Sequence, residues 1–380
     1  MQCFALVRTD VVPSASQNAA QMRTDGETCP FSQGYCPNDL QAAYDLPSLK
    51  AGSGKTVAIV DAYGYKHAAS DLATFRKTMG LKACDTDTKC LRIVNQEGHS
   101  SPLPPEPPAS DDWKGEESLD LDMVSGICPN CKIILVQANN DYTSNLYTGV
   151  KTAGSLGAKY IGVSWGGSPE GSDNPIFHQA GVVITAAAGD EGGGGSYGGG
   201  PIQPCTYTYV VCIGGTHLVH SGNKRGWGET VWNDWTFDEC GGPCGATGSA
   251  CSKKIAKPSW QTDNGCKMRS AADTSATASL RAPVIVYNSE EGGYGLYGGT
   301  SESTQIIAGV YALAGNAASQ MGASYFWKHH AGHVNDVTSG NNLDAGLGVT
   351  CASSVPYICT ARVGFDGPTG WGTPEGVEAF

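Results

Sequence analysis

Runs of apolar residues, many of them β-branched, recur along the chain between segments with helical spacing. A run that is apolar at almost every position is typical of a strand buried on both faces of a sheet. The predicted strands are 56–63, 132–138, 160–165, 182–188, 209–213 and 284–287. Helices are predicted at 68–79 and 144–156, after the first two of these strands. This alternation predicts an α/β fold with a central, mostly parallel sheet covered by helices on both faces.

The segment before the first predicted strand differs in character from the rest. Residues 1–45 lack periodicity and carry Ser, Asn, Gln and Pro. We expect them to form an N-terminal extension that packs on a single body formed by residues 46–380. No linker in the sequence divides this body, and no internal repeat is found.

Polar residues at the ends of the predicted strands are candidate site residues, because ligands of parallel sheets bind beyond the carboxyl ends of the strands. Asp61 ends the first strand, Ser164 to Gly167 end the third, and Asp190 follows the fourth. A side chain at this edge can donate a hydrogen bond to the oxyanion of a tetrahedral intermediate. Asp190 can donate only while it is protonated, which points to acid pH. The alternative is a loop aspartate that caps a turn.

A glycine-rich turn leads into an apolar helix within residues 297–313. Two glycines precede Thr300 and Ser301, and apolar residues with helical spacing follow at once. The first turn of a helix carries unpaired N–H groups and a partial positive charge, which favour an oxyanion nearby. Ser301 is therefore a candidate nucleophile. The alternative is a plain Thr/Ser helix cap.

A nucleophilic serine needs a base, because a free hydroxyl is barely nucleophilic. The chain has eight histidines, and none is followed by the Gly-Thr pair of a subtilisin-type histidine helix. Glu116 and Asp120 instead lie four residues apart on a predicted helix, so both carboxylates project from one face. Two close carboxylates resist simultaneous ionisation, so the pair can accept and pass a proton at acid pH. The alternatives are an exposed acidic face, and Glu117 acting in place of Glu116.

Fifteen cysteines are too many for a protein of a reducing cytosol. Most occur at short spacings that could close small loops: Cys29/Cys36, Cys84/Cys90, Cys128/Cys131, Cys205/Cys212, Cys240/Cys244, Cys351/Cys359, and also Cys251/Cys266. We interpret them as the disulfide framework of a secreted, extracellular protein whose export signal has been removed, with Cys3 as the odd thiol. A redox pair is the alternative for residues 128–131.

The overall charge limits the partners of the protein. The formal net charge of −12 argues against binding to nucleic acid or anionic membranes. No apolar run reaches the roughly 18 residues of a membrane span.

Taken together, these segments resemble the sedolisins, the serine-carboxyl peptidases with a subtilisin-like fold. The resemblance covers about residues 45–380. It rests on the run at 56–63, the Glu-x-x-x-Asp of Glu116 and Asp120, Ser-Trp-Gly-Gly from Ser164, Ala-Gly-Asp ending at Asp190, Gly-Gly-Thr-Ser ending at Ser301, and the segment 366–374. It implies a subtilisin-like three-layer fold and a secreted, acid-acting peptidase that hydrolyses peptide bonds through an acyl-enzyme.

The resemblance assigns a role to each candidate residue. Ser301 attacks the peptide carbonyl, Glu116 takes its proton, Asp120 orients Glu116, and Asp190 completes the oxyanion hole. The family's spacing of four residues selects Glu116 over its neighbour Glu117.

The same resemblance gives the remaining site residues. Asp61 has at most a supporting role behind Asp120. Substrate is expected to contact the segment Ser164, Trp165, Gly166 and Gly167, with Trp165 and the two glycines forming walls of the first pocket.

The family also carries one calcium ion, Ca2+, near its C-terminus. The matching ligands are the side chains of Asp336 and Asp366 with the carbonyl oxygens of Val337, Arg362 and Gly364. Oxygen-only coordination suits this hard cation. The alternative is a pair of turn-forming aspartates.

Two departures from the family stand out. Glu302 follows the candidate nucleophile where the family usually has a small residue, and it places a charge beside Ser301. The long pro-domain of the family is absent, so we expect either that it was cleaved or that this chain folds with its short arm alone. We expect a monomer that acts on peptide or protein substrates; the alternatives are an inactive sedolisin-like protein-binding module and a histidine-dependent protease.

Overall fold

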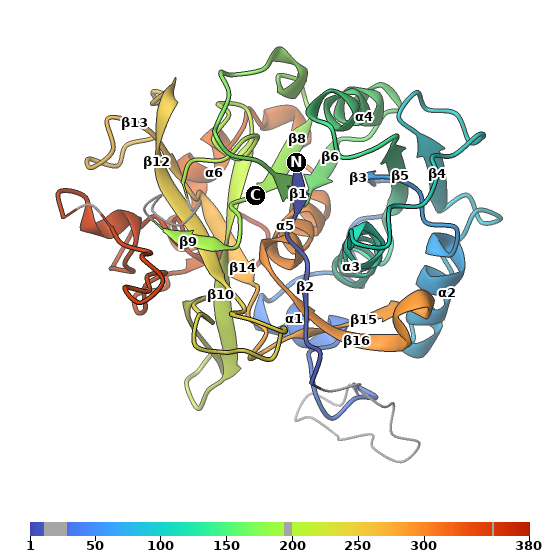
Figure 1. Cartoon of the computed structure of the whole chain (residues 1–380), viewed down its shortest axis with the longest axis horizontal. Coiled ribbons are helices and arrows are strands. Elements are labelled where there is room, and N and C mark those ends of the chain that lie inside the picture. The colour runs from blue at the N-terminus through green and yellow to red at the C-terminus, as the bar shows by residue number, and fades with distance from the viewer. Residues whose placement is uncertain (11–28, 194–199, 352) are drawn as a thin grey trace.

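An eight-stranded sheet runs through the centre of the structure, a computed structural model that describes residues 1–10, 29–193, 200–351 and 353–380. Neighbouring strands are parallel except for the antiparallel pair β10 and β11. The strand order is β11 (Trp227–Val231), β10 (Val211–His220), β8 (Val183–Ala187), β6 (Tyr160–Val163), β3 (Thr56–Ala62), β5 (Lys132–Ala138) and β4 (Leu91–Asn95), with β14 (Thr274–Thr277) also paired with β10. The predicted mostly parallel sheet is confirmed (Figure 1).

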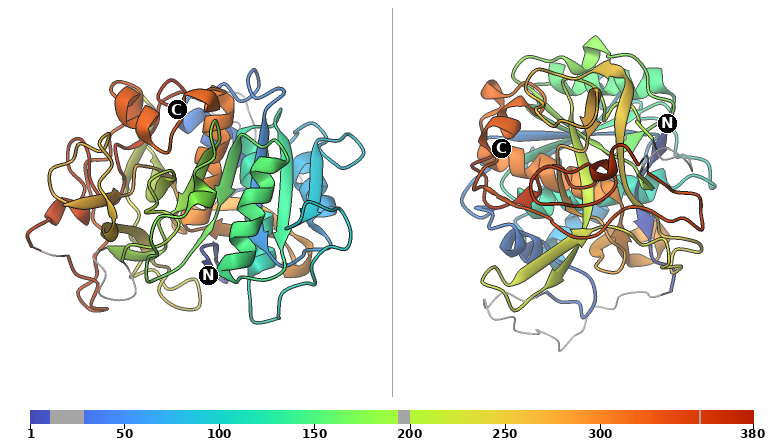
Figure 2. Two further views of the ribbon diagram at one scale, coloured as in Figure 1. Left: turned by 90° about the horizontal axis from the view of Figure 1, so that it is seen from above. Right: turned by 90° about the vertical axis from the view of Figure 1, so that its left-hand side faces the viewer.

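The apolar strands are buried on both faces because each face packs against helices (Figures 1 and 2). Along β3, Val57 and Ile59 join the core that contains the helices α3 (Trp113–Ile127) and α5 (Thr300–Ala314). The alternate residues Ala58 and Val60 join a second core on the opposite face, with α4 (Thr143–Ser155). Successive side chains of a strand point to opposite faces, so these two cores require the continuous apolar run that the sequence shows.

The helices α3 and α5 pack directly on each other and are buried on all sides rather than along one stripe. Gly309 of α5 allows this approach, because a Cβ at that position would lie 2.6 Å from Cγ2 of Ile127. The shorter helices α1 (Pro37–Ala43) and α2 (Ala68–Thr78) pack on the outer side of α3. The contact between α3 and α5 is what brings acidic residues of one helix to the first turn of the other.

Smaller sheets surround this core. β1 (Gln2–Cys3) pairs with β7 (Trp165–Gly166), and β2 (Leu6–Val7) pairs with β16 (Gly293–Gly298) of the hairpin β15 (Val284–Asn288) and β16. A three-stranded sheet contains β9 (Glu191–Gly193), β12 (Ala246–Ala256) and β13 (Met268–Ala271), and a two-stranded sheet contains β17 (Val334–Asn335) and β18 (Thr373–Pro374). The last α-helix among the described residues is α6 (Ser324–His329). The predicted strand at 284–287 therefore forms, but in an antiparallel hairpin outside the central sheet. A tight turn ending at Gly292 (φ 92°) returns the chain at once, which excludes a parallel crossover.

All fourteen cysteines other than Cys3 form disulfides between partners close in sequence. The pairs are Cys29–Cys36, Cys84–Cys90, Cys128–Cys131, Cys205–Cys212, Cys240–Cys244, Cys251–Cys266 and Cys351–Cys359. Cys128–Cys131 is buried at the end of α3, as a structural bridge requires.

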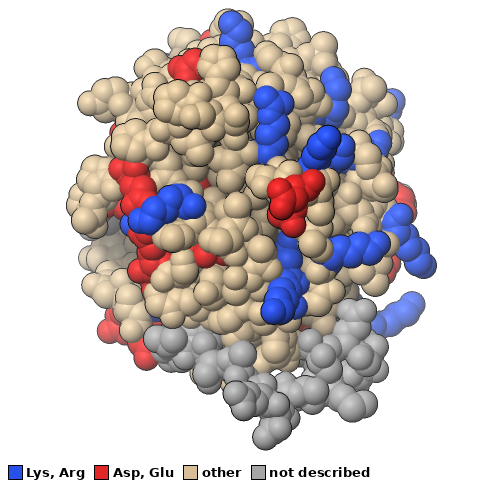
Figure 3. Space-filling model, turned by 90° about the vertical axis from the view of Figure 1, so that its right-hand side faces the viewer, with Lys and Arg blue, Asp and Glu red and all other residues tan. Residues whose placement is uncertain are grey.

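Charged side chains on one face of the molecule are dispersed. Figure 3 shows Lys and Arg side chains scattered among uncharged residues on this face, with acidic groups gathered mainly toward one edge. Among the helices in the described part of the chain, none is long and apolar enough to cross a membrane.

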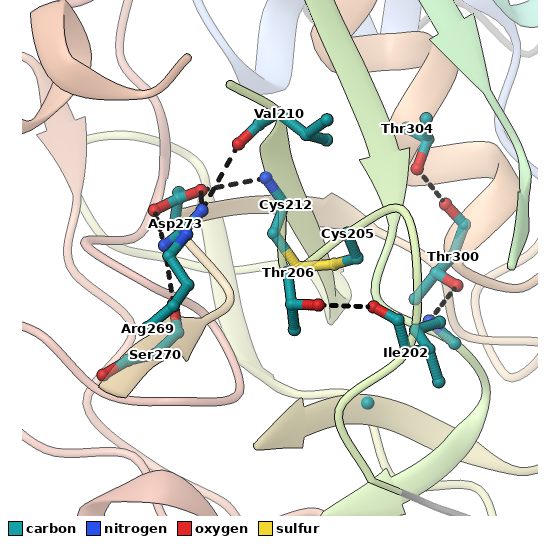
Figure 4. Close-up of a disulfide and its surroundings, with 12 residues drawn as sticks. Ile202, Cys205, Thr206, Val210, Cys212, Arg269, Ser270, Asp273, Thr300 and Thr304 are labelled. Atoms are coloured by element: carbon teal, nitrogen blue, oxygen red, sulfur yellow. Dashed lines mark hydrogen bonds and ion pairs between the residues drawn. A yellow bond between two sulfur atoms is a disulfide. The ribbon is translucent and has the colours of Figure 1, made fainter. Parts of the chain in front are cut away.

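A buried ion pair connects the smaller sheets to β10. Asp273 accepts hydrogen bonds from the guanidinium group of Arg269 and from Cys212 N, the latter at 2.9 Å (Figure 4). It also accepts one from Trp327 Nε1 at 2.7 Å. Neither side chain of the ion pair is exposed to solvent. Removing one partner of such a pair leaves an uncompensated buried charge.

We therefore predict that Asp273→Ala lowers the free energy of unfolding by about 3–5 kcal/mol, because Arg269 loses its counter-charge. Urea unfolding followed by tryptophan fluorescence measures this change. Lys66→Ala is the matched control, since the Lys66 side chain is 59% exposed in its ion pairs and its loss should change stability little. Equal effects of the two substitutions would contradict the prediction.

Candidate active site

Ser301 lies in the first turn of α5, where the helix begins against the edge of the central sheet. Gly299 precedes this turn with φ 95°, a conformation that side-chain-bearing residues rarely adopt. Ser301 Oγ donates a hydrogen bond to the carbonyl oxygen of Ser164 at 3.1 Å, and it lies near enough to Glu116 to lower the pKa of that carboxyl group partway. The serine is therefore held between a helix N-terminus and a carboxyl group, not paired with a histidine in the described structure.

The acidic residues of α3 are buried. Glu116 and Asp120 have no exposed surface, and Asp61, near the end of β3, is equally buried. Burial and then the charge of Asp61 raise the pKa of Glu116 and of Asp120 well above their usual values. Burial likewise raises the pKa of Asp61 to about 8. Glu116 and Asp120 therefore do not lie on an exposed acidic helix face; together with Asp61 they form one buried carboxyl cluster.

Members of this cluster differ in their partners. Ser301 and Asp120 both lower the raised pKa of Glu116 partway, and Glu116 Oε1 is buried without a hydrogen-bond partner among the described residues. Glu117, the alternative base, faces the sheet, where Gln137 Nε2 of β5 donates to its two oxygens at 3.0 and 3.2 Å. The geometry thus favours Glu116 as the group that exchanges a proton with Ser301.

Asp190 lies beside the first turn of α5. Its Oδ1 accepts hydrogen bonds from Thr300 N at 2.9 Å and from Thr300 Oγ1 at 2.6 Å. Its Oδ2 is buried without a hydrogen-bond partner among the described residues. Burial raises the pKa of Asp190 to about 7, although the bonds from Thr300 lower it partway. Below that pH, Asp190 carries a proton that it can donate.

Gln305 is a site residue that sequence reasoning missed. Its Nε2 donates to Asp120 Oδ2 and, at 2.9 Å, to Ser164 Oγ. It thereby ties the carboxyl cluster to the segment beneath Ser301. Its position four residues after Ser301, on the same face of one helix, is a signal that could have identified it.

The segment predicted to contact substrate contributes mainly its backbone. The side chain of Trp165 is fully buried, donates to Val60 O and stacks on Tyr147, so it supports the sheet rather than forming a pocket wall. Gly167 does line a cavity near Asp190. Gly166 pairs with the N-terminal segment through β1 and β7.

That N-terminal segment crosses the candidate active site. Phe4 N and Ala5 N donate to the same oxygen, Glu116 Oε2, at 2.9 and 2.7 Å. Phe4 N also lies 3.2 Å from the carbonyl oxygen of Ser164. No pattern in the sequence predicts that residues 2–7 lie here, close to Ser301.

Glu302, the unusual neighbour of Ser301, is fully buried. Burial raises its pKa well above the usual value, and the neighbouring side chain of Thr277 in β14 lowers it partway. The side chain therefore faces β14, and it tends to be neutral rather than a charge beside Ser301.

A second acidic site lies in the C-terminal region. The Asp366 carboxylate accepts hydrogen bonds from Thr369 and from Arg362 N, and Gly364 N donates to Asp336 Oδ2 at 2.8 Å. Burial raises the pKa of Asp366 to about 7, and the charge of Asp336 contributes to this. Within the described residues, the carbonyl oxygens of Val337, Arg362 and Gly364 accept no hydrogen bond. This oxygen set fits a hard cation.

A further group of potential metal ligands, near the N-terminal end of α1, does not form a metal site. Atoms of Cys29, Cys36 and Asp39 lie within 4.8 Å of one another, but the two sulfurs are joined in a disulfide.

Comparisons with known proteins agree with this geometry. Residues 106–344 match the subtilase family, Peptidase_S8. Sedolisin from Pseudomonas sp. (strain 101) is 27% identical over 376 residues, an alignment that covers 90% of this chain and 60% of sedolisin. Kumamolisin from Bacillus sp. (strain MN-32) is 27% identical over 375 residues, covering 90% of this chain and 62% of kumamolisin. The chain therefore spans about 60% of the length of these curated relatives.

A solved structure supports the same fold. The structure of Pseudomonas sedolisin, a serine-carboxyl proteinase in complex with two molecules of pseudo-iodotyrostatin, superimposes with a TM-score of 0.71 at 24% identity. The match covers 90% of this chain and 96% of that chain. The predicted subtilisin-like fold is confirmed.

The buried carboxyl groups predict a stability that falls as the pH rises. In the unfolded chain these groups lose their protons near pH 4, whereas burial keeps Asp61 protonated up to about 8 and Asp190 up to about 7. Between these limits the folded state binds more protons, so each group lowers the free energy of unfolding by about 1.4 kcal/mol per pH unit. Thermal unfolding from pH 4.5 to 8.5 should show a decreasing Tm.

Asp61→Asn should make this decline shallower, because it removes one of the raised groups. Asp85→Asn is the control: the pKa of Asp85 is lowered by its bonds with Thr88, so the substitution leaves the slope above pH 4.5 unchanged. A Tm that rises toward pH 8.5 would show that these groups are ionised in the folded state.

Proposed function

The chain belongs to the subtilase family and, within it, to the sedolisins, and on this premise we propose that it is a serine-carboxyl peptidase. It hydrolyses peptide bonds through an acyl-enzyme formed at Ser301. The observation that supports this most is the arrangement of Ser301, Glu116 and Asp120, three fully buried side chains that interact with one another at the first turn of a helix.

In the first step Ser301 Oγ forms a bond to the substrate carbonyl carbon while Glu116 takes the hydroxyl proton. Asp120 holds Glu116 in position and shares the proton. The oxyanion that develops accepts a hydrogen bond from protonated Asp190 and is favoured by the N-terminus of α5.

The intermediate then collapses to the acyl-enzyme. The carbon–nitrogen bond breaks and the amine leaves with the proton held by Glu116. Water next attacks the ester carbon and gives a proton to Glu116; the bond to Ser301 Oγ then breaks, Glu116 returns the proton to Oγ, and the second product leaves as a carboxylic acid. Asp61 has no reacting partner in this scheme; it raises the proton affinity of the cluster behind Glu116.

The peptidase acts in acid. Asp190 must be protonated to donate, which holds below its pKa of about 7. Glu116 must be able to accept a proton, which it does as a member of a cluster that shares protons among three carboxyl groups. Above neutrality Asp190 becomes an anion beside the developing oxyanion, and activity is lost.

The protein functions outside the reducing cytosol, as its seven disulfides favour. Its substrates are peptides or denatured proteins that enter as extended strands along Ser164 to Gly167. The net charge of −12 disfavours nucleic acid as a partner. It acts as a monomer.

Calcium is the ion that fits the C-terminal acidic site. Asp336 and Asp366 supply carboxylate oxygens, and the three free carbonyl oxygens at residues 337, 362 and 364 complete an oxygen-only set. Bound there, the ion offsets the two negative charges and ties the C-terminal loop to the body.

We predict that Ser301→Ala and Glu116→Gln each lower kcat by at least about 10⁴-fold, because each removes a member of the proton-transfer unit. Cleavage of a denatured protein is measured at pH 4 and pH 8, with activity expected only in acid. Glu117→Gln is the matched control, since it alters the adjacent buried carboxyl group that faces Gln137. It should retain most of the activity.

Full activity of Glu116→Gln, or equal activity of the unaltered protein at both pH values, would refute the carboxyl-base mechanism. No cleavage at either pH would favour a protein-binding module instead.

Asp190→Asn separates the oxyanion role from the base. Asparagine donates a hydrogen bond at every pH, so the variant should keep substantial activity and its alkaline limb, expected near pH 7, should move upward. The measurement is kcat as a function of pH. If the variant is fully active and its alkaline limb stays at the same pH, the loss of activity at high pH is due to the deprotonation of another group.

Calcium should stabilise the folded protein, because it binds the folded state alone. At about 100 times Kd, linkage gives about 2.7 kcal/mol, which raises Tm by several degrees. Asp336→Asn should abolish this dependence, whereas the control Asp344→Asn, at an aspartate that caps an exposed turn, should retain it. A Tm that changes neither on addition of calcium nor on chelation would show that calcium does not bind at this site.

A further inference from the structure

A second cavity lies between the loop that joins β12 to β13 and the loops near the C-terminus, which are red in Figure 1. Its volume is about 510 Å³, which is in the range of sites that hold small molecules. Its walls are residues 262–265 and 362–365, together with Ser354, Tyr357 and Trp371. They combine apolar and polar groups, as a ligand site requires.

This cavity is distinct from the two sites described above. None of its residues lines the cavity beside Asp190. Arg362 and Gly364 contribute carbonyl oxygens to the candidate calcium site, but the carboxylates of Asp336 and Asp366 are not part of the cavity walls. A molecule bound in the cavity would therefore lie beside the calcium site and not in it.

The two walls of the cavity are held together by one tyrosine. The OH group of Tyr357 accepts a hydrogen bond from Cys266 N at 2.9 Å and donates one to Asp263 at 2.5 Å. A Cβ on Gly265 would lie 1.8 Å from the Tyr357 ring, so this contact requires glycine. The disulfides Cys251–Cys266 and Cys351–Cys359 constrain the two loops further. The cavity is thus preformed.

Arg362 is the one cation in the walls, and its side chain is held in a fixed position. The guanidinium carbon lies 4.3 Å from the centre of the Tyr357 ring, and Nε donates to the carbonyl oxygen of Phe365 at 2.8 Å. Its Nη1 and Nη2 atoms form no hydrogen bond or ion pair with any described residue. These planar N–H groups can bind a carboxylate in a bidentate manner.

Asp263, the one acidic residue in the walls, is already paired. Its Oδ2 lies 2.9 Å from Lys257 Nζ and accepts a hydrogen bond from Ser270 Oγ at 2.8 Å. The Asp263 side chain has no exposed surface, whereas Arg362 is exposed. The charge that the cavity offers to a ligand is therefore positive, which favours an anion.

Apolar surface lies next to this positive charge. Val363 is 83% exposed, and the aromatic residues Phe365 and Trp371 line the same cavity. Asn264 and Ser354 add hydrogen-bonding groups to the walls. A ligand that satisfies all of these groups carries an anionic group beside an apolar group and has amides that can form hydrogen bonds.

We propose that this cavity binds the C-terminal carboxylate of a peptide whose last residue is apolar. Arg362 binds the carboxylate, and Val363 and Trp371 contact the last side chain. The binding does not depend on Ser301. Hydrolysis of a peptide bond creates one such end at each cleavage, so the occupants belong to the class of molecules that the proposed peptidase would release.

The test is isothermal titration calorimetry of Ser301→Ala, which cannot turn over a peptide, in calcium-containing buffer near pH 6, where a peptide carboxyl group is ionised. The probes are acetyl-Ala-Ala-Leu and the same peptide with a C-terminal amide. We expect a Kd of about 0.1–1 mM for the acid. The amide should bind at least about tenfold more weakly, because it loses the charge-assisted bonds to arginine.

Substitutions in the same protein assign the binding to this cavity. Arg362→Met keeps a stem over Tyr357 but should weaken binding of the acid at least about tenfold and remove the difference between acid and amide. Val363→Ser should weaken both peptides about 3- to 10-fold and keep that difference. Val363 is 83% exposed, so this variant should fold even if Arg362→Met does not. Arg92→Met, at another exposed arginine, is the matched control and should change neither affinity.

Three results would overturn the inference: no binding of the acid at about 10 mM, equal affinities for acid and amide, or binding of the acid that neither Arg362→Met nor Val363→Ser weakens. Each of them leaves the proposed function intact, because cleavage of denatured protein by the unaltered chain is measured separately. Conversely, a chain that cleaves nothing but binds the acid through Arg362 loses the proposed function and retains this site.

Discussion

Burial of acidic side chains between α3, α5 and the edge of β3 is the constraint on which the rest of the site depends. Asp61, Glu116 and Asp120 have no contact with solvent, and isolated carboxylates there would be costly to ionise. The fold meets this cost by keeping protons on the cluster and by supplying donors from Gln305 and from the backbone of residues 4 and 5. A high affinity for protons is therefore a consequence of the packing itself.

The central sheet could be predicted because its strands are buried on both faces and so are apolar throughout. β12 and β13 could not, since Ala246–Ala256 and Met268–Ala271 are rich in Ala, Ser, Gly and Lys and show no run or alternation. The run at 284–287 has the composition of a central strand but lies in a hairpin. The turn at Gly292 determines its position, and the composition of the strand does not predict this turn.

The site was predictable as far as local spacing and family resemblance reach. Glu116 and Asp120 share a helix face, and Ser301 follows a turn in which Gly299 has a positive φ. These residues can therefore be recognised from their spacing in the sequence. Phe4 meets Glu116 across 112 positions of sequence, and Gln305 meets Asp120 across 185. Contacts between residues so far apart in the sequence depend on how the helices and the sheet pack, so no periodicity of the sequence predicts them.

The same protons serve stability and chemistry. Protonated Asp190 costs less to bury than its anion and can also donate to an oxyanion, so both properties change near its pKa of about 7. The bonds from Thr300 to Oδ1 hold this side chain in place and leave Oδ2 free for the reacting group. An asparagine would satisfy the geometry without the titration. The aspartate therefore couples a folded, acid-stable site to acid action, and a rise in pH weakens both together.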